Sequence, residues 1–187
     1  MKTIKKVALA LGIAATGLVS AQSSNMNNIL KVGVSGGFAV PRENASGAVG
    51  VDVAYQHIVT PGVGLGLATG YTQYFGIHSN GNDNNDFGVI PAAALIRIYP
   101  QKTGFYFGTD IGYGFITGSG KVARNSAVER PNGGFYLQPE IGFHNKNWNF
   151  GIRYQKVFTE GKGEILDQKY NAGNIGATVA YNIPLGK

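Results

Sequence analysis

Six charged residues stand within stretches of the chain that alternate between apolar residues and small or polar ones. Each occupies the small, polar side of the alternation, as Asp110 does in the stretch 105–115. Successive side chains of a β-strand point to opposite faces, so this spacing predicts that all six share one face. They are Lys31, Asp52, Arg97, Asp110, Glu140 and Arg153. Because an unpaired buried charge is costly, we predict a structural network of ion pairs centred on the two arginines, Asp110 and Glu140. The functional alternative is that these charges line a narrow, weakly conducting pore.

The three histidines show no arrangement that is typical of catalysis or metal binding. His57 and His144 stand beside short predicted turns, and His78 lies in a polar loop. No two of them have the spacing of zinc ligands. A lipid-modifying barrel enzyme needs a serine–histidine pair on its outer wall, whereas His78 and Ser79 both lie in the loop. The chain has no cysteine, which excludes thiolate chemistry and disulfides. We therefore predict no catalytic residues, no cofactor and no metal site.

The segment 80–86 is rich in asparagine and aspartate, with oxygen ligands at alternate positions. Its composition resembles that of a calcium-binding loop. It lacks the bidentate glutamate that an EF-hand places at its twelfth position. We interpret the segment as a mobile surface loop, and its composition leaves open whether the loops bind a metal ion.

The stretch 105–115 shows most clearly which element carries the charges. Its alternate residues from Phe105 to Phe115 are apolar or aromatic apart from one threonine, and the others are mostly small or polar. Its length suits a tilted membrane strand, which needs roughly 9–11 residues. Similar alternation is present in the stretches 29–40, 48–56, 63–75, 87–99, 135–144, 148–156 and 174–183. Eight strands with an apolar side facing lipid are therefore predicted. Pro91 and Pro139 fall within two of them and predict β-bulges, because proline cannot donate a ladder hydrogen bond.

The connections between these strands alternate in length. The segments 41–47, 76–86, 117–134 and 158–173 are long or polar, and the segments 58–62, 100–104 and 145–147 are short. Outer-membrane barrels have short turns on the periplasmic side and longer loops outside. The pattern predicts a closed, antiparallel, up-and-down barrel of eight strands with both ends of the chain on the periplasmic side.

Aromatic residues fall at two heights along the predicted strands, as the girdles at the two membrane interfaces do. The predicted periplasmic girdle consists of Tyr55, Phe105, Trp148 and Tyr181. The predicted outer girdle consists of Phe38, Tyr71, Phe75, Phe87, Phe115, Phe135 and Tyr154. Because these residues belong to different strands, their shared heights favour a lipid-facing wall over a scattered core.

Composition and charge are consistent with one such domain. The mean hydropathy of −0.04 is too low for a bundle of apolar helices, and the 29 glycines suit tight turns and a closely packed lumen. Residues 1–21 are typical of a secretory signal, with lysines, a short apolar core and small residues before a cut after Ala21. The rival interpretation is a membrane anchor, for which the apolar run is short. The barrel domain then covers 22–187 and is only slightly basic. No basic cluster with interleaved aromatics indicates nucleic-acid binding.

Four motifs carry a family resemblance: VGVSGGF, FYFGTDIGYGF, FYLQPEIGF and the closing IGATVAYNI. In these the chain resembles the eight-stranded OmpA/OmpX-like outer-membrane β-barrels. Its glycine-rich style is most similar to the outer membrane protein beta-barrel domain of Bacteroidota. The resemblance covers nearly all of the chain after residue 21, and its diffuse motifs specify the fold better than the task.

These observations favour a non-enzymatic scaffold in a Gram-negative outer membrane. Its partners would be outer-membrane lipid and, through the long loops, surface ligands, with roles in envelope integrity, adhesion or ligand contact. We expect a monomer. Three alternatives stay open: a small porin-like channel, a lipid-modifying outer-membrane enzyme and a soluble ligand carrier of lipocalin type.

Overall fold

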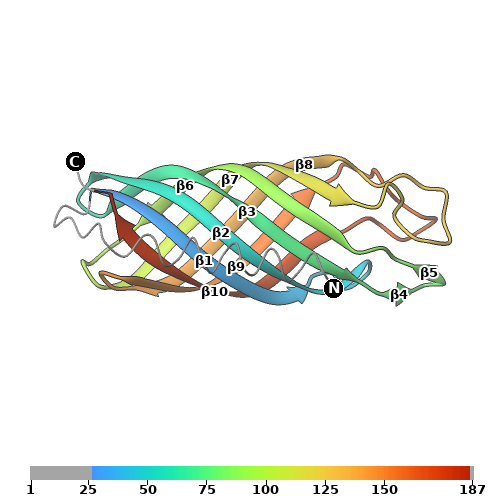
Figure 1. Ribbon diagram of the computed structural model, residues 1–187, viewed down its shortest axis with the longest axis horizontal. Helices are drawn as coiled ribbons and strands as arrows, with labels where there is room; N and C mark the ends of the chain where they lie inside the picture. The colour runs from blue at the N-terminus through green and yellow to red at the C-terminus, as the bar shows by residue number, and fades with distance from the viewer. Residues whose placement is uncertain (1–26, 186–187) are drawn as a thin grey trace.

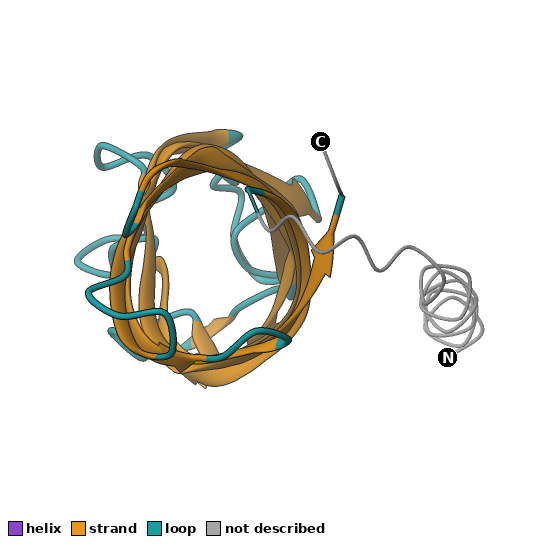
Figure 2. Ribbon diagram, turned by 90° about the vertical axis from the view of Figure 1, so that its left-hand side faces the viewer, coloured by secondary structure: helices purple, strands orange, loops and turns teal. Residues whose placement is uncertain are grey.

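Eight long strands close into an antiparallel barrel, as the sequence predicts (Figure 1). The computed structural model describes residues 27–185, so the predicted signal at 1–21 lies outside the described residues. The barrel strands are β1 (Asn28–Ala39), β2 (Ala45–Thr60), β3 (Val63–Gly76), β6 (Phe87–Ile98), β7 (Gly104–Gly118), β8 (Gly133–His144), β9 (Trp148–Phe158) and β10 (Ala172–Pro184). Each strand pairs with its neighbours in the chain, and β1 pairs with β10 to complete the ring seen in Figure 2. A closed ring leaves no barrel strand with an unpaired edge.

The connections alternate in length, with one departure from the sequence prediction. Long segments, 77–86, 119–132 and 159–171, join strands at one end of the barrel, and short turns, 61–62, 99–103 and 145–147, join them at the other. The first connection on the long side is brief, because β2 already begins at Ala45. We call these ends the long-loop end and the short-turn end. The described chain both enters and leaves the barrel at the short-turn end.

The segment interpreted as a mobile loop instead contains a small hairpin. Its strands are β4 (His78–Ser79) and β5 (Asn82–Asp83), joined by Asn80 and Gly81. Both turn residues have positive φ, 50° and 76°, as a two-residue type I′ turn requires. The Asn-Gly dipeptide is itself a hairpin signal, so this element was visible in the sequence.

The two prolines do not produce the predicted bulges. The pairing of β3 with β6 is interrupted opposite Pro91 and continues beyond it in the same register. The pairing of β8 with β9 is interrupted in the same way at Pro139. Each proline lacks an N–H and so interrupts the ladder on one side. The other neighbour, β7 in both cases, pairs with the proline without a gap. A missing hydrogen bond therefore does not require an inserted residue.

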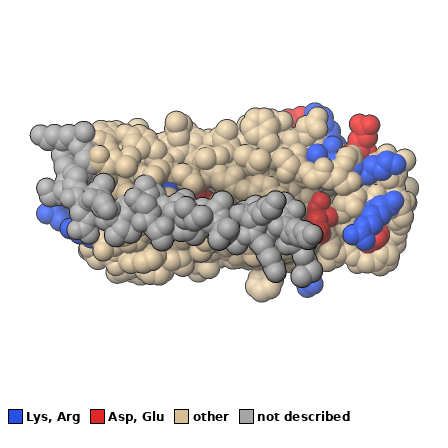
Figure 3. All heavy atoms as spheres, in the orientation of Figure 1, with Lys and Arg blue, Asp and Glu red and all other residues tan. Residues whose placement is uncertain are grey.

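The barrel is apolar outside and polar inside. Large apolar side chains point outward from all eight strands, and among them Val34 is 60% exposed, Leu67 68% and Phe105 67%. The alternating positions point inward and carry buried charged and amide side chains such as Arg97 and Gln155. On the face shown in Figure 3, the charged atoms gather toward the two ends and the wall between them is mostly uncharged. A water-soluble barrel has the opposite distribution.

Among residues 27–185, no helix has both the length and the apolar character to span a bilayer.

Candidate functional site

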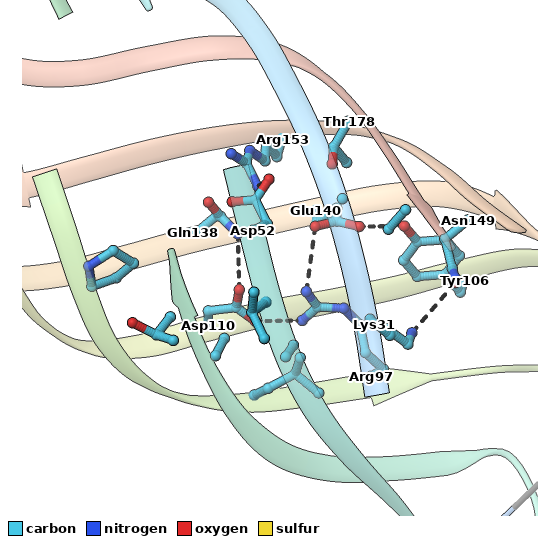
Figure 4. Close-up of a pocket in the computed structure, with 18 of the residues that line it drawn as sticks. Lys31, Asp52, Arg97, Tyr106, Asp110, Gln138, Glu140, Asn149, Arg153 and Thr178 are labelled. Atoms are coloured by element: carbon cyan, nitrogen blue, oxygen red, sulfur yellow. Dashed lines mark hydrogen bonds and ion pairs between the residues drawn. The ribbon is translucent and has the colours of Figure 1, made fainter. Parts of the chain in front are cut away.

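The six charged residues lie inside the barrel, each on a different strand. Figure 4 shows Lys31 of β1, Asp52 of β2, Arg97 of β6, Asp110 of β7, Glu140 of β8 and Arg153 of β9. All belong to the inward set of their strand, which is the face that the period-two pattern assigns to them. The layer holds three basic and three acidic side chains, so their formal charges are equal in number.

Arg97 lies at the centre of the larger ion-pair group. Its guanidinium is 2.6 Å from the carboxylate of Asp110 and 3.3 Å from that of Glu140, with all three side chains almost fully buried. Gly108 pairs with Arg97 across the β6–β7 ladder. A Cβ at position 108 would lie 2.2 Å from Arg97 Cδ, so only glycine leaves the guanidinium its place. The absence of a side chain at Gly108 of β7 thus leaves room for the Arg97 side chain.

Polar side chains satisfy the remaining oxygens of the two carboxylates. Gln138 Nε2 donates to the second oxygen of Asp110 at 2.8 Å, and the Tyr136 hydroxyl donates to Gln138 Oε1 at 2.8 Å. The Tyr106 hydroxyl donates to Glu140. Buried ion pairs are tolerated when such extra hydrogen bonds accompany them. The group is therefore a connected network.

Arg153 forms a second, smaller group. Its guanidinium lies 3.0 Å from Asp52 and donates a hydrogen bond of 2.6 Å to the Ser35 hydroxyl. The sequence prediction centred one network on both arginines. The structure instead gives each arginine its own carboxylates, because Asp52 reaches Arg153 across the barrel from β2.

Lys31 differs from the two arginines in its partners. Its ammonium donates to the Tyr99 hydroxyl at 2.7 Å and to Asn149 Oδ1 at 3.3 Å. It also lies 5.3 Å from the Tyr99 ring centre, within cation–π range. None of the ion pairs formed among residues 27–185 includes Lys31. The Lys31 side chain is thus stabilised by the Tyr99 hydroxyl, the Asn149 amide and the face of the Tyr99 ring.

Tyr99, in the turn after β6, connects Lys31 to a glutamine. Its hydroxyl accepts from Lys31 and donates to Gln56 Oε1 at 2.8 Å. Burial raises the pKa of the Tyr99 hydroxyl to about 12, and the hydrogen bond to Gln56 acts weakly in the opposite direction. The hydroxyl therefore stays protonated at neutral pH and keeps donating to Gln56.

The charged layer leaves little open space in the middle of the barrel. The void between these side chains is about 50 Å³ and is lined by residues of both ion-pair groups, including Arg97, Asp110 and Arg153. A single water needs roughly 10–15 Å³ of such volume, so the void holds a few waters at most. Eight-stranded barrels are narrow enough for side chains to fill them in this way.

Phe87 corrects one predicted girdle residue. The sequence prediction places Phe87 in the outer girdle, but its exposed fraction is 2% and it lies inside the barrel. Its ring stacks on that of Tyr74 with centroids 4.6 Å apart, and Tyr170 lies against it at 5.2 Å. Phe87 has the same parity along β6 as Arg97, so the period-two pattern itself places it on the inward face.

An apolar plug seals the long-loop end around Phe87. Tyr74, Val89, Ile116 and Val157 of the strands are buried there together with Val122 and Tyr170 of the loops. Burial raises the pKa of Tyr170 far above its ordinary value, which keeps its hydroxyl neutral. The plug and the charged layer together close the barrel from the long-loop side.

The long connections are bound to one another by amide side chains. Gln168, in the connection 159–171, accepts from Asn82 Nδ2 at 2.7 Å and donates to Asn84 Oδ1 at 3.2 Å and to the Glu43 carbonyl at 3.1 Å. Asn125, in the connection 119–132, donates to the Gly81 carbonyl at 2.7 Å. All four long-side connections are therefore linked. Sequence reasoning missed this cap because its partners lie far apart along the chain.

The other predicted girdle aromatics lie on the outer wall. Ten remain after Phe87 is removed: Phe38, Tyr55, Tyr71, Phe75, Phe105, Phe115, Phe135, Trp148, Tyr154 and Tyr181. Nine are exposed and Tyr154 is half-buried. Edge-to-face pairs such as Trp148–Tyr181, with centroids 5.0 Å apart, join neighbouring strands.

Two of the histidines, His57 and His144, contact an amide oxygen and a backbone carbonyl oxygen. His57 Nδ1 lies 2.7 Å from Asn28 Oδ1, and His144 Nε2 lies 3.2 Å from the Gln101 carbonyl. Within residues 27–185, no cluster of three histidine, cysteine or acidic side chains could hold a metal ion.

Comparisons with known proteins agree on the architecture. No protein-family model matches the chain, and no curated protein matches it. Ail, the attachment invasion locus protein of Yersinia pestis, is 12% identical, with a TM-score of 0.51 over 83% of this chain and 97% of Ail. The outer membrane protein OprG of Pseudomonas aeruginosa is 12% identical, with a TM-score of 0.52 over 83% of this chain and 93% of OprG. The chain shares the fold of these two proteins. At this identity the likeness concerns the fold alone.

Proposed function

We propose that the protein is embedded in the outer membrane of a Gram-negative bacterium as a non-enzymatic barrel scaffold. The observation that carries this proposal is the inverted distribution of side chains, with an apolar wall outside and a charged layer inside. Exposed apolar patches on soluble proteins rarely exceed a few hundred Å². A wall that presents Leu67, Phe105 and Ile152 at 60% exposure or more suits hydrocarbon as its surroundings.

The closed lumen favours a scaffold over a channel. The charged layer leaves about 50 Å³ of void, and the apolar plug lies between it and the long loops. The linked connections of the long-loop end then offer a fixed surface for adhesion, ligand contact or envelope integrity. In the topology of outer-membrane barrels this end faces outward and the short turns face the periplasm.

We also propose how the protein reaches the membrane and which kind of bacterial barrel it is. The segment 1–21 would act as the secretory signal that delivers the chain, with cleavage after Ala21. The glycine-rich strands suit a Bacteroidota-type barrel that is monomeric and surrounded by outer-membrane lipid. Sequencing the amino terminus of the mature protein tests the cleavage position directly.

Cell fractionation combined with gel migration tests the proposal. We expect the protein in the outer-membrane fraction, and we expect its band to shift when the sample is boiled before electrophoresis. A closed barrel resists detergent until heating unfolds it, which gives the shift. Recovery of the folded protein in the aqueous fraction without detergent would contradict the proposal and favour the soluble carrier.

A further inference from the structure

A cavity of about 670 Å³ opens at the short-turn end of the barrel. Lys31 and Asn149 mark its inner limit, because both also line the small void of the charged layer. Its rim includes Lys102 and Lys146 from two of the turns and His144 from the end of β8, and none of the described residues that line it is acidic. We call this cavity the short-turn vestibule. The scaffold function proposed above does not need it.

The acidic residues of the chain are distributed away from the vestibule. Of the ten, three are the lumen carboxylates, and the rest lie at the long-loop end. On the face shown in Figure 3, the short-turn end has blue atoms and no red ones. A concave site lined by charges of one sign attracts ligands of the opposite sign. The vestibule therefore suits an anion.

Lys31 keeps hydrogen-bonding capacity for such an anion. A lysine ammonium has three N–H donors, and here two of them serve Tyr99 and Asn149. Asp110 and Glu140 are bound by Arg97 and do not approach Lys31 within ion-pair distance. The third N–H of Lys31 has no carboxylate partner among residues 27–185.

Gln56 supplies a second, independent observation. Its side chain is fully buried and lines the vestibule, and its Nε2 atom has no hydrogen-bond partner among the described residues. Gly64 gives the amide its space, since a Cβ at position 64 would lie 2.4 Å from Gln56 Nε2. A buried donor without an acceptor is costly, so an acceptor oxygen supplied by a ligand in the vestibule would stabilise it.

We propose that the short-turn vestibule binds a small organic or inorganic anion through a carboxylate or phosphate group. Its oxygens accept hydrogen bonds from Lys31 Nζ and Gln56 Nε2. The Tyr99 hydroxyl holds both side chains in place, because it accepts from Lys31 Nζ and donates to Gln56 Oε1. Lys102 and Lys146 attract the anion from the rim. In the topology proposed above, the ligand enters from the periplasm.

Calorimetric titration of the purified barrel in neutral detergent micelles tests the site. The probes are sodium succinate for the carboxylate and sodium phosphate for the phosphate, each at constant ionic strength with chloride as the balancing anion. We expect saturable binding of at least one probe with one site per barrel. Lys31→Met removes one of the two donors and should weaken binding about tenfold or more. Gln56→Glu removes the amide donor, places a carboxylate beside the bound anion and should abolish binding.

Matched controls separate this site from general attraction to a basic surface. Lys121→Gln removes an exposed lysine at the long-loop end and should leave the affinity unchanged. A heat-dependent gel shift verifies that each variant is folded, and Gln56→Leu replaces Gln56→Glu if the latter fails this check. The proposal is wrong if neither probe saturates by about 20 mM, because a site with a dissociation constant of about 1 mM would be nearly full at that concentration. It is equally wrong if Lys121→Gln weakens binding as much as Lys31→Met does. Neither result bears on whether the barrel lies in a membrane.

Discussion

At the scale of single residues, the buried charges divide into those that are paired and one that is not. Arg97 is held by two carboxylates and Arg153 by one, whereas Lys31 relies on Tyr99 and Asn149. Removing one member of a buried ion pair leaves the other desolvated without compensation. The same change in an exposed pair costs little, because water replaces the lost partner. Residues 27–185 contain three buried pairs and one exposed pair, which permits a direct comparison.

Replacing Arg97 by methionine should destabilise the barrel strongly. Asp110 and Glu140 would remain buried without their cation, and the expected loss in free energy of unfolding is about 3–5 kcal/mol. The control is Arg124→Met, which breaks the exposed pair with Asp83 at 3.2 Å and should cost about 1 kcal/mol or less. Urea unfolding in lipid vesicles, followed by the fluorescence of Trp148, measures both. Equal losses in the two variants would show that the lumen network does not stabilise the barrel.

At the scale of elements, the long-side connections behave as one cap over the apolar plug. Gln168 contacts residues from two other connections, and Asn125 links the fourth to the β4–β5 hairpin. Val122 and Tyr170 anchor two of the connections in the plug. Loops on outer-membrane barrels are exposed to water, so this order has to come from such contacts.

Replacing Gln168 by alanine should loosen this cap without opening the barrel. The variant loses hydrogen bonds to Asn82, Asn84 and the Glu43 carbonyl, and we expect faster trypsin cleavage after Lys162 and Lys169. Leu166→Ala is the control, because Leu166 is 95% exposed in the same connection. Cleavage rates followed by mass spectrometry decide the matter. If trypsin cleaves Gln168→Ala no faster than Leu166→Ala, the hydrogen bonds of Gln168 do not hold the cap in place.

The strands could be predicted from the sequence, and their connections could be predicted only in part. Period-two alternation predicts that Arg97 points inside, and it predicts the same for Phe87, whose aromatic ring alone suggests a girdle position. Asn80-Gly81 carries a hairpin signal that a general polar composition concealed. The bonds of Gln168 to Asn82, Asn84 and Glu43 join residues more than eighty positions apart. No local pattern specifies such contacts, because barrel closure brings their partners together.

At the scale of the whole molecule, the barrel is closed in its middle and open at the short-turn end. The apolar plug and the charged layer occupy the lumen, and the short-turn vestibule ends at Lys31. A pore would need water along its full length. The proposed scaffold role and the proposed anion site both require that the vestibule stop at this layer.

Planar-bilayer recordings test this closure. We expect no stepwise conductance from the purified native protein, because the void at the charged layer is about 50 Å³. Reproducible single-channel steps that vanish in Arg97→Met or Arg153→Met would instead support the small porin-like channel. Each variant is first checked for the heat-dependent gel shift, so that loss of the fold is not taken for loss of a pore.

The most direct test asks which solvent contacts the apolar wall. The chain has no cysteine, so a single nitroxide label can be attached through Leu67→Cys on the wall or Asn125→Cys on the cap. Electron paramagnetic resonance on the barrel in lipid vesicles then compares relaxation by oxygen, which concentrates in hydrocarbon, with relaxation by a water-soluble nickel chelate. We expect oxygen to dominate the relaxation at position 67 and the nickel chelate to dominate it at position 125. Equal access of the nickel chelate to both labels would contradict a wall embedded in lipid.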